Sequence, residues 1–310
     1  MKDKLLNQSQ SLNQSQLLDQ EQSLNQDQSQ SLNQSQLLDQ ERTLDQQNQG
    51  AMLFGIPFWN NTLEVLLNQL EKQLSNHSGG LIHICTPNPE HIMLAQKHKE
   101  FQGVLESADI NVPDGFGVVL ASRLLLAHDK QCKQRISGRE LMFHVISLLN
   151  ERSPAKQTVF FLGGKQGAAQ QLAAQLAAQF PNILFKFDEG AKDISKETAE
   201  EKARVLKKIA SAQPRLLFVA YGAPFQELWI HQHRQELEAA GVQVAMGVGG
   251  AFEMLLGTIP IAPEFAQKHG IEWLWRLAQE PWRWKRQLAL VHFSIKTFQL
   301  FLSQSLSNKT

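Results

Sequence analysis

The sequence predicts an α/β fold in which a parallel sheet is flanked by helices. From residue 51 onward, short apolar runs rich in β-forming residues alternate with helical patterns, which is typical of βαβ units. A second observation concerns the division of the chain: the amino-acid composition changes near residues 50 and 263. We therefore expect a low-complexity tail at 1–49, an α/β domain at 50–262 and a helical appendage at 263–310.

Six apolar runs are candidate strands: Leu81–Cys85, Asp109–Val112, Thr158–Leu162, Ile183–Phe187, Leu216–Ala220 and Val242–Val248. Helical patterns lie between them, for example at Gln166–Phe180 and Ser195–Ala212. Parallel sheets bind their ligands at the carboxyl ends of the strands. The residues directly after each strand are therefore the candidates for a functional site.

The first 49 residues are rich in Gln, Ser and Asn, and one decapeptide, SLNQSQLLDQ, occurs at both 11–20 and 31–40. A ten-residue unit breaks any heptad seam, so a sustained coiled coil is not expected. We expect a disordered or fluctuating helical tail without a catalytic role. Weak self-association or contact with a membrane surface stays open for it.

The chain beyond Pro263 combines tryptophans with basic residues, and a largely apolar segment follows at Leu288–Leu302. This combination is typical of the membrane–water interface. A helical hairpin packed on the sheet, with its arginines in solvent, explains the pattern equally well. Three arginines would share a face if one helix ran through Pro281: Arg276, Arg283 and Arg286.

The charges and cysteines exclude several classes of protein. Thirty Lys and Arg balance thirty Asp and Glu, which argues against a general nucleic-acid binder. Cys85 and Cys132 have no metal-like spacing and suit a reducing compartment. The N-terminus lacks the apolar stretch of a signal peptide, and no apolar run reaches the roughly 18–20 residues that span a bilayer. We expect a cytoplasmic enzyme.

Polar residues follow the first two strands. Thr86 and Asn88 come after the first, where Pro89 fits the first position of a helix and Asn88 its cap. Capping alone accounts for Asn88. Asp114 stands between a proline and a glycine after the second strand. A carboxylate there can accept a proton from an attacking hydroxyl as a general base, and capping of the next helix is an equal alternative.

Glycine turns follow the third and the last strand, at Gly163 and Gly164 and at Gly249 and Gly250. Such turns let a backbone approach a phosphate, although many serve steric needs alone. Gln226, after the fifth strand, has an amide that can read a base or sugar edge. No Asp-x-Asp pair stands at a strand end and no histidines have metal spacing, so we expect no metal and no other cofactor. Backbone amides and Arg or Lys would then support a leaving diphosphate.

Taken in order, these strand ends resemble the WecG/TagA/CpsF glycosyltransferases (glycosyltransferase family 26) from about Phe54 to Arg286. The motifs that carry the resemblance are Thr86-Pro87-Asn88-Pro89-Glu90, Pro113-Asp114-Gly115, Arg135-Ile136-Ser137-Gly138, Phe161-Leu162-Gly163-Gly164, Gly222-Ala223-Pro224-Phe225-Gln226-Glu227, Gly247-Val248-Gly249-Gly250, Ala262-Pro263, Glu272-Trp273-Leu274-Trp275-Arg276-Leu277 and Glu280-Pro281-Trp282-Arg283.

The resemblance implies a Rossmann-like catalytic domain whose C-terminal appendage binds the membrane and completes the site. It implies inverting transfer of N-acetylmannosamine or a related sugar from a UDP donor to an undecaprenyl-diphosphate-linked acceptor. The reaction would serve cell-surface polysaccharide synthesis at the inner face of the cytoplasmic membrane. Asp114 would be the general base. The other implied substrate contacts are Thr86, Asn88, Arg135, Gln226, Arg276, Arg283 and Arg286.

The chain departs from the family pattern at three positions. Ile261 stands where arginine usually precedes Ala-Pro, Phe225 where lysine is common, and Glu140 where aspartate is common. The sequence leaves open the donated sugar, the acceptor and the oligomeric state, including a homo-oligomer. The rival hypothesis is a non-catalytic nucleotide-binding or scaffold protein on the same fold, joined to partners through its tail.

Overall fold

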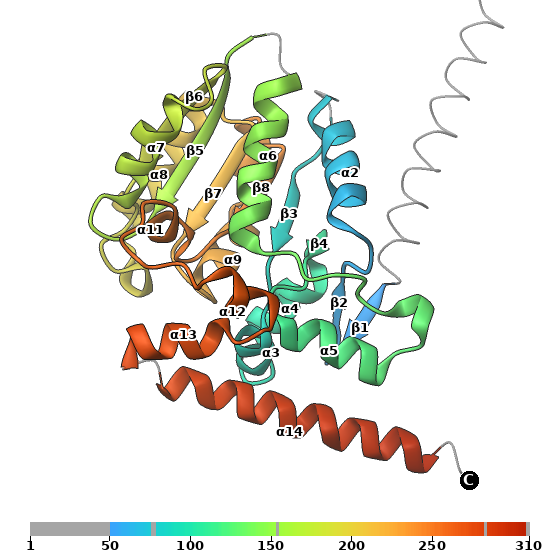
Figure 1. The fold of residues 1–310 in the computed structure, drawn as a ribbon. Helices are drawn as coiled ribbons and strands as arrows, with labels where there is room; N and C mark the ends of the chain where they lie inside the picture. The colour runs from blue at the N-terminus through green and yellow to red at the C-terminus, as the bar shows by residue number, and fades with distance from the viewer. Residues whose placement is uncertain (1–49, 76–78, 153–154, 282–283, 308–310) are drawn as a thin grey trace, which may run out of the picture. The chain divides into compact units, whose positions relative to one another are not determined.

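The computed structural model describes residues 50–75, 79–152, 155–281 and 284–307, so the expected disordered tail at 1–49 lies outside the described residues. A six-stranded parallel sheet with the order β4-β3-β8-β7-β5-β6 lies at the centre of the fold (Figure 1). Its strands are β3 (Ile82–Cys85), β4 (Ile110–Asn111), β5 (Gln157–Gly163), β6 (Ile183–Asp188), β7 (Leu216–Ala220) and β8 (Val244–Gly247). All six expected strands are present, and the predicted α/β class is confirmed.

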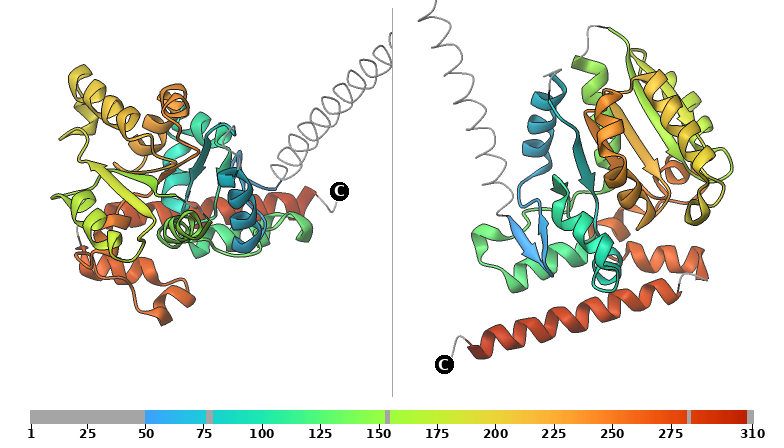
Figure 2. Two further views of the ribbon diagram at one scale, coloured as in Figure 1. Left: turned by 90° about the horizontal axis from the view of Figure 1, so that it is seen from above. Right: turned by 180° about the vertical axis from the view of Figure 1, so that it is seen from behind.

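Both faces of the sheet are covered, which is why its strands read as nearly continuous apolar runs. Along β5, Val159 and Phe161 point into one buried cluster, while Phe160 and Leu162 point into another on the opposite face. Figure 2, seen from above, shows the helices on the two sides. The first face packs against α2 (Leu63–Ser75), α6 (Gly138–Arg152) and α7 (Ala168–Ala177), and the second against α8 (Ala199–Ala212), α9 (Phe225–Gln232) and α10 (Arg234–Ala239).

An antiparallel hairpin, β1 (Ala51–Leu53) and β2 (Ile56–Phe58), was not expected from the sequence. Its turn residues, Phe54 and Gly55, both have positive φ, as a two-residue hairpin turn requires. Three-residue strands are too short to show a clear alternation, and Phe-Gly is an unusual turn pair. The hairpin shares a separate apolar cluster with α3 (Pro89–Ala95), α4 (Lys99–Ser107) and α5 (Phe116–Leu125).

The C-terminal part contains α11 (Ala251–Leu255), α12 (Glu264–Lys268), α13 (Glu272–Gln279) and α14 (Trp284–Ser307), and two short 3-10 turns lie earlier, at His128–Lys130 and Ile194–Lys196. One helix does not run through Pro281. Glu280 ends α13 with a non-helical backbone (φ −129°, ψ 73°), because a residue before proline is driven out of the α region. The condition for the three arginines to share one helical face, a helix that runs through Pro281, is therefore not met, and Arg283 itself lies outside the described residues.

Helix α14 lies below the carboxyl ends of the strands and packs against α3 and α5 (Figures 1 and 2). Phe293 is its main anchor: the side chain is 4% exposed and its ring lies 5.3 Å from that of Phe54. Within the described ranges, no helix is both long enough and apolar enough to cross a membrane.

Candidate active site

A cavity of about 1130 Å³ lies between the carboxyl ends of the strands and the C-terminal helices. Its lining comes from the turns after β3, β4, β7 and β8 and from α13 and α14. Strand β3 lies beside β8, while its own connection runs to β4 on the other side. Such a switch point opens a crevice where an α/β sheet binds its ligands.

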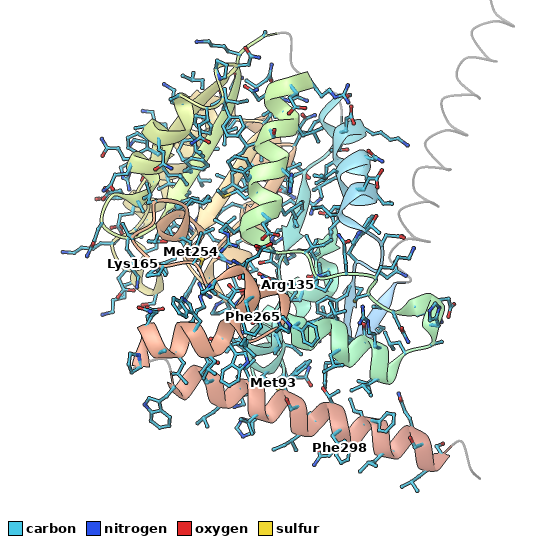
Figure 3. All side chains as sticks on the ribbon, in the orientation of Figure 1. Met93, Arg135, Lys165, Met254, Phe265 and Phe298 are labelled. Atoms are coloured by element: carbon cyan, nitrogen blue, oxygen red, sulfur yellow. The ribbon has the colours of Figure 1, made fainter. Side chains whose placement is uncertain are left out.

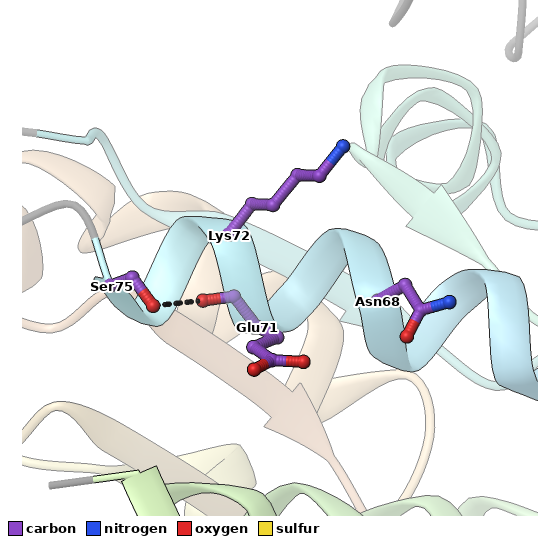
Figure 4. Close-up of a pocket in the computed structure, with 4 residues that line it drawn as sticks. All are labelled: Asn68, Glu71, Lys72 and Ser75. Carbon is purple, nitrogen blue, oxygen red and sulfur yellow. Dashed lines mark hydrogen bonds between the residues drawn. The ribbon is translucent and has the colours of Figure 1, made fainter.

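A second hollow lies on the surface of α2 (Figure 4). It is lined by Asn68, Glu71, Lys72 and Ser75, all from one helix. Ser75 Oγ donates to the Glu71 carbonyl at 2.8 Å, and Arg152 pairs with the Glu71 carboxylate at 2.9 Å. No strand end or glycine turn contributes to its lining, so we assign no function to this hollow.

Asp114 lines the cavity directly after β4. It does not cap the following helix, because the N-cap of α5 is Gly115, at φ 102°, a value that glycine adopts readily. Instead, Asp114 Oδ2 accepts the Gly138 N–H at the start of α6 (3.4 Å), and Oδ1 lies 3.7 Å from Arg135 Nε. The side chain is 29% exposed, so a substrate hydroxyl can reach it.

Burial raises the pKa of the Asp114 carboxyl above its ordinary value. Arg135, the Gly138 N–H and Arg276 oppose this rise, whereas the negative charge of Glu272 adds to it. A carboxylate with a raised pKa is a stronger base, and enzymes use this effect to tune general bases. The electrostatics at Asp114 therefore suit proton abstraction.

Arg135 connects Asp114 to the C-terminal helices. Its Nη2 donates to Glu272 Oε2 on α13 at 3.0 Å, and its Nη1 donates to the Gln267 carbonyl on α12 at 3.5 Å. Its Nε is buried and has no hydrogen-bond partner among the described residues. Glu272 had no role in the sequence analysis beyond opening a motif, because 137 residues separate it from Arg135.

Thr86 and Asn88 both line the cavity after β3. Thr86 is 6% exposed, and α6 begins so close to it that a Cβ at Gly138 would lie 3.1 Å from Thr86 Cγ2. Asn88 caps α3 as expected: its Oδ1 accepts the His91 N–H at 3.0 Å, with Pro89 in the first turn. Asn88 Oδ1 is therefore already engaged in a hydrogen bond that caps α3.

Gln226 is 1% exposed, and its side-chain amide is hydrogen-bonded to other residues of the chain. Its Oε1 accepts the N–H groups of Gly222 (3.0 Å) and Gly249 (2.9 Å), and its Nε2 donates to Glu227 Oε1 at 2.7 Å. Gln226 therefore joins the turn after β7 to the turn after β8. Glu227 is buried as well, and burial raises its pKa to about 7.

The two glycine turns differ in what they contribute. Gly249 and Gly250 line the cavity, whereas Gly163 and Gly164 are not among its lining residues. A Cβ on Gly163 would lie 2.9 Å from the ring of Tyr221, so close packing alone requires glycine there. Lys165, which directly follows this pair, does reach the cavity.

The remaining basic residues gather near α11 and α13. Arg276 lines the cavity, and its Nη2 lies 3.3 Å from Met254 Sδ. Figure 3 shows Lys165, Met254 and Arg135 along the edge of the sheet that faces α13. Arg283 and the side chain of Arg286 lie outside the described residues.

The described residues hold neither a cluster of metal ligands nor a cysteine suited to nucleophilic attack. In the part of the chain that the structure describes, no three His, Cys, Asp or Glu side chains gather as metal ligands would. Cys85 and Cys132 are buried, and burial raises the pKa of both thiols, to about 11 for Cys132. Neither thiol suits nucleophilic catalysis, since the thiolate is the reactive form.

The cavity has a polar part and an apolar part. Asp114 and Arg135 line it near the strand ends, and further charged side chains, such as Glu272 and Arg276, come from α13. The apolar part is formed by α14 through Leu288, Val291, Phe293 and Ile295, with Phe116 of α5 beside them. An elongated ligand with a charged head and an apolar body would match this division.

Comparison with known proteins supports the resemblance to the WecG/TagA/CpsF glycosyltransferases along most of the chain. Residues 51–307 match the model of the Glycosyl transferase WecG/TagA/CpsF family. A protein of Bacillus subtilis (strain 168), named N-acetylglucosaminyldiphosphoundecaprenol N-acetyl-beta-D-mannosaminyltransferase, is 31% identical over 80% of this chain and 90% of its own length. Proteins of the same name from Bacillus spizizenii and Staphylococcus aureus (strain MW2) are each 33% identical over 76% of this chain and 85% of their own length.

Proposed function

This chain belongs to the WecG/TagA/CpsF family of glycosyltransferases, and from that premise we propose that it transfers an N-acetylmannosamine-type sugar from a UDP donor to an undecaprenyl-diphosphate-linked acceptor. The names of its relatives support the sugar and the acceptor, since they specify an N-acetylmannosaminyl group and N-acetylglucosaminyldiphosphoundecaprenol. The product would serve cell-surface polysaccharide synthesis.

The observation that best supports this proposal is the division of the cavity. Its polar part holds a carboxylate with a raised pKa and several basic side chains, and its apolar part is a wall of α14. A polyprenyl-diphosphate-linked sugar has the same sequence of properties: a hydroxyl-bearing head, a diphosphate and a hydrocarbon chain. A nucleotide-binding scaffold would have no need of the apolar part.

Asp114 is the general base in the proposed mechanism. Its carboxylate takes the proton of the acceptor hydroxyl while the hydroxyl oxygen attacks the anomeric carbon of the donor sugar. The bond from that carbon to the UDP oxygen breaks, and its electron pair leaves with UDP. Basic side chains and backbone N–H groups of the cavity stabilise the charge on the leaving diphosphate. One direct displacement inverts the anomeric configuration, and no metal takes part.

We further propose that α14 binds the surface of the inner leaflet. Its exposed apolar side chains recur at intervals of three and four residues and so share one face. They are Trp284, Leu288, Val291, Ile295, Phe298, Leu302 and Leu306, each at least 45% exposed. Four of them, Trp284, Leu288, Val291 and Ile295, also line the cavity, so the apolar face continues from the cavity to the outer surface. An interfacial helix of this kind would let a lipid tail stay in the bilayer while its head reaches Asp114.

The test uses the purified chain, a panel of UDP-sugars and a short-chain acceptor that carries N-acetylglucosamine on a lipid diphosphate. UDP is expected to form from UDP-N-acetylmannosamine only when the acceptor is present. A chain that binds UDP but releases none from any donor would support the scaffold hypothesis instead. Co-sedimentation with anionic vesicles tests the membrane proposal separately.

A further inference from the structure

Glu227 is a buried carboxylate that the proposed mechanism does not use. It lies in the first turn of α9, is 1% exposed and is not among the residues that line the cavity. Its Oε1 accepts a hydrogen bond from Gln226 Nε2 at 2.7 Å, whereas its Oε2 is buried and has no hydrogen-bond partner within the described ranges. Burial raises the pKa of this carboxyl to about 7. The folded chain therefore disfavours the charged form, and stability alone does not explain an acid at this position.

The carboxylate selects one orientation of the Gln226 amide. The amide oxygen accepts the N–H groups of Gly222 at 3.0 Å and Gly249 at 2.9 Å, which only the oxygen side of an amide can do. The reversed amide would direct its NH2 group at two N–H donors. An ionised carboxylate accepts but does not donate, so Glu227 matches the NH2 group in the observed orientation and opposes the reversed one.

The place of this amide is also set by the strand beside it. A Cβ at Gly247 of β8 would lie 2.7 Å from Gln226 Nε2 and 2.9 Å from Gln226 Cδ, so the amide fits there only because residue 247 is glycine. Gly222 and Gly249 both line the cavity. The hydrogen bonds thus form one chain, from Glu227 through the amide to the turns after β7 and β8. A shift of the amide would shift this part of the cavity wall.

We propose that Glu227 is a positioning residue: it fixes the Gln226 amide, and the amide fixes the two turns that form the cavity wall after β7 and β8. The inference rests on the proposed function, because backbone N–H groups of the cavity are assigned there to the leaving UDP. Glu227 acts through its acceptor oxygen, since no charge is needed to receive the Gln226 N–H. The simpler alternative is that Glu227 stabilises α9 as an acid in its first turn, and this alternative predicts an effect on stability alone.

The test measures kcat/KM for transfer to the short-chain acceptor, the affinity for UDP by calorimetry, and the melting temperature. Glu227→Met keeps a similar length but has no acceptor oxygen. It should lower kcat/KM and the UDP affinity about 100-fold, the effect of a displacement of about 1 Å in an active site. Glu227→Gln keeps an oxygen for the Gln226 N–H and should stay near the wild type. Glu200→Met is the matched control, because Glu200 also lies in the first turn of a helix, α8, but is exposed.

A reciprocal exchange tests the hydrogen-bond chain itself. Gln226→Glu places two carboxylates against each other and removes the N–H donor, so kcat/KM should fall. Adding Glu227→Gln restores a donor and an acceptor between the two side chains, while residue 226 still offers oxygen to the N–H groups of Gly222 and Gly249. The double variant should therefore exceed Gln226→Glu by about tenfold or more, the scale of coupling within one hydrogen-bond network.

Three results would overturn the inference: wild-type kcat/KM and UDP affinity in Glu227→Met, an equal loss in Glu227→Gln, or a double variant that recovers melting temperature but not kcat/KM. If Glu227→Met does not fold, the comparison of Gln226→Glu with the double variant decides. A wild type that binds UDP but transfers no sugar disproves the proposed function alone, and the UDP affinities of the variants then decide the inference. If UDP binding is too weak to measure, kcat/KM decides it, and a wild type that neither binds UDP nor transfers sugar overturns both proposals.

Discussion

Replacing Asp114 with asparagine separates catalysis from stability. The amide keeps an oxygen for the Gly138 N–H, and Arg135 keeps its 3.0 Å ion pair with Glu272. The lost pair spans 3.7 Å between side chains that are 29% and 21% exposed, so its removal should cost no more than about 1 kcal/mol. Turnover, in contrast, should fall about 10²–10⁴-fold, which corresponds to about 2.7–5.4 kcal/mol in the activation barrier.

The raised pKa of Asp114 also predicts how the stability difference between the wild type and Asp114→Asn changes with pH. Burial raises the pKa of Asp114 in the folded chain, so the folded state holds this proton to a higher pH than the unfolded state does. The wild type therefore loses stability relative to Asp114→Asn as the pH rises from the unfolded value, about 3.9, through the raised folded value. Above that window, the variant should melt at the same temperature as the wild type or higher.

The assay combines UDP release on a soluble acceptor with thermal melting at pH 5 and pH 8. Asp129→Asn is the control, because Asp129 is fully outside the cavity and exposed. Near-normal turnover in Asp114→Asn would remove Asp114 from the mechanism. A melting temperature many degrees below that of the wild type at pH 8 would show that the carboxylate mainly supports the fold.

Three further predictions concern the rest of the site. Glu272→Gln removes a charge that raises the pKa of Asp114, so the acidic limb of the kcat/KM profile should move to lower pH, and an unmoved limb contradicts the coupling. Phe293 is 4% exposed, so Phe293→Ala should lower the melting temperature and raise the acceptor KM. Phe298 is 60% exposed, so Phe298→Ala should weaken vesicle binding alone. An equal loss of melting temperature in both variants would refute the different roles of the two side chains. EDTA should leave turnover intact, and activity lost to EDTA and restored by magnesium or manganese would show that a metal takes part.

Local chemistry made much of the fold predictable. Strands β3, β5, β7 and β8 were visible because both of their faces are buried, so each reads as an apolar run between helical patterns. The edge strand β6 is buried on one face only and was visible from its apolar β-forming residues. The cap at Asn88 and the helix break at Pro281 follow from the preferences of single residues, and both are present. The hairpin at residues 51–58 was missed because its strands have three residues each and its turn pair is uncommon.

The contacts within the site depend on residues that are far apart in the sequence. Gln226 was a candidate reader of a base or sugar edge, yet its oxygen is held by Gly222 and by Gly249, 23 residues away. The ion pair of Arg135 with Glu272 joins the loop before α6 to helix α13 across 137 residues.

The most direct test of the proposed reaction is the anomeric configuration of its product. Wild-type chain would be incubated with UDP-N-acetylmannosamine and the short-chain acceptor, and the new glycosidic bond examined by NMR while UDP is quantified. Direct displacement with Asp114 as the base predicts one UDP per linkage formed and an anomeric configuration opposite to that of the donor. Retained configuration, or UDP accompanied by free sugar in place of the glycosylated acceptor, would contradict it.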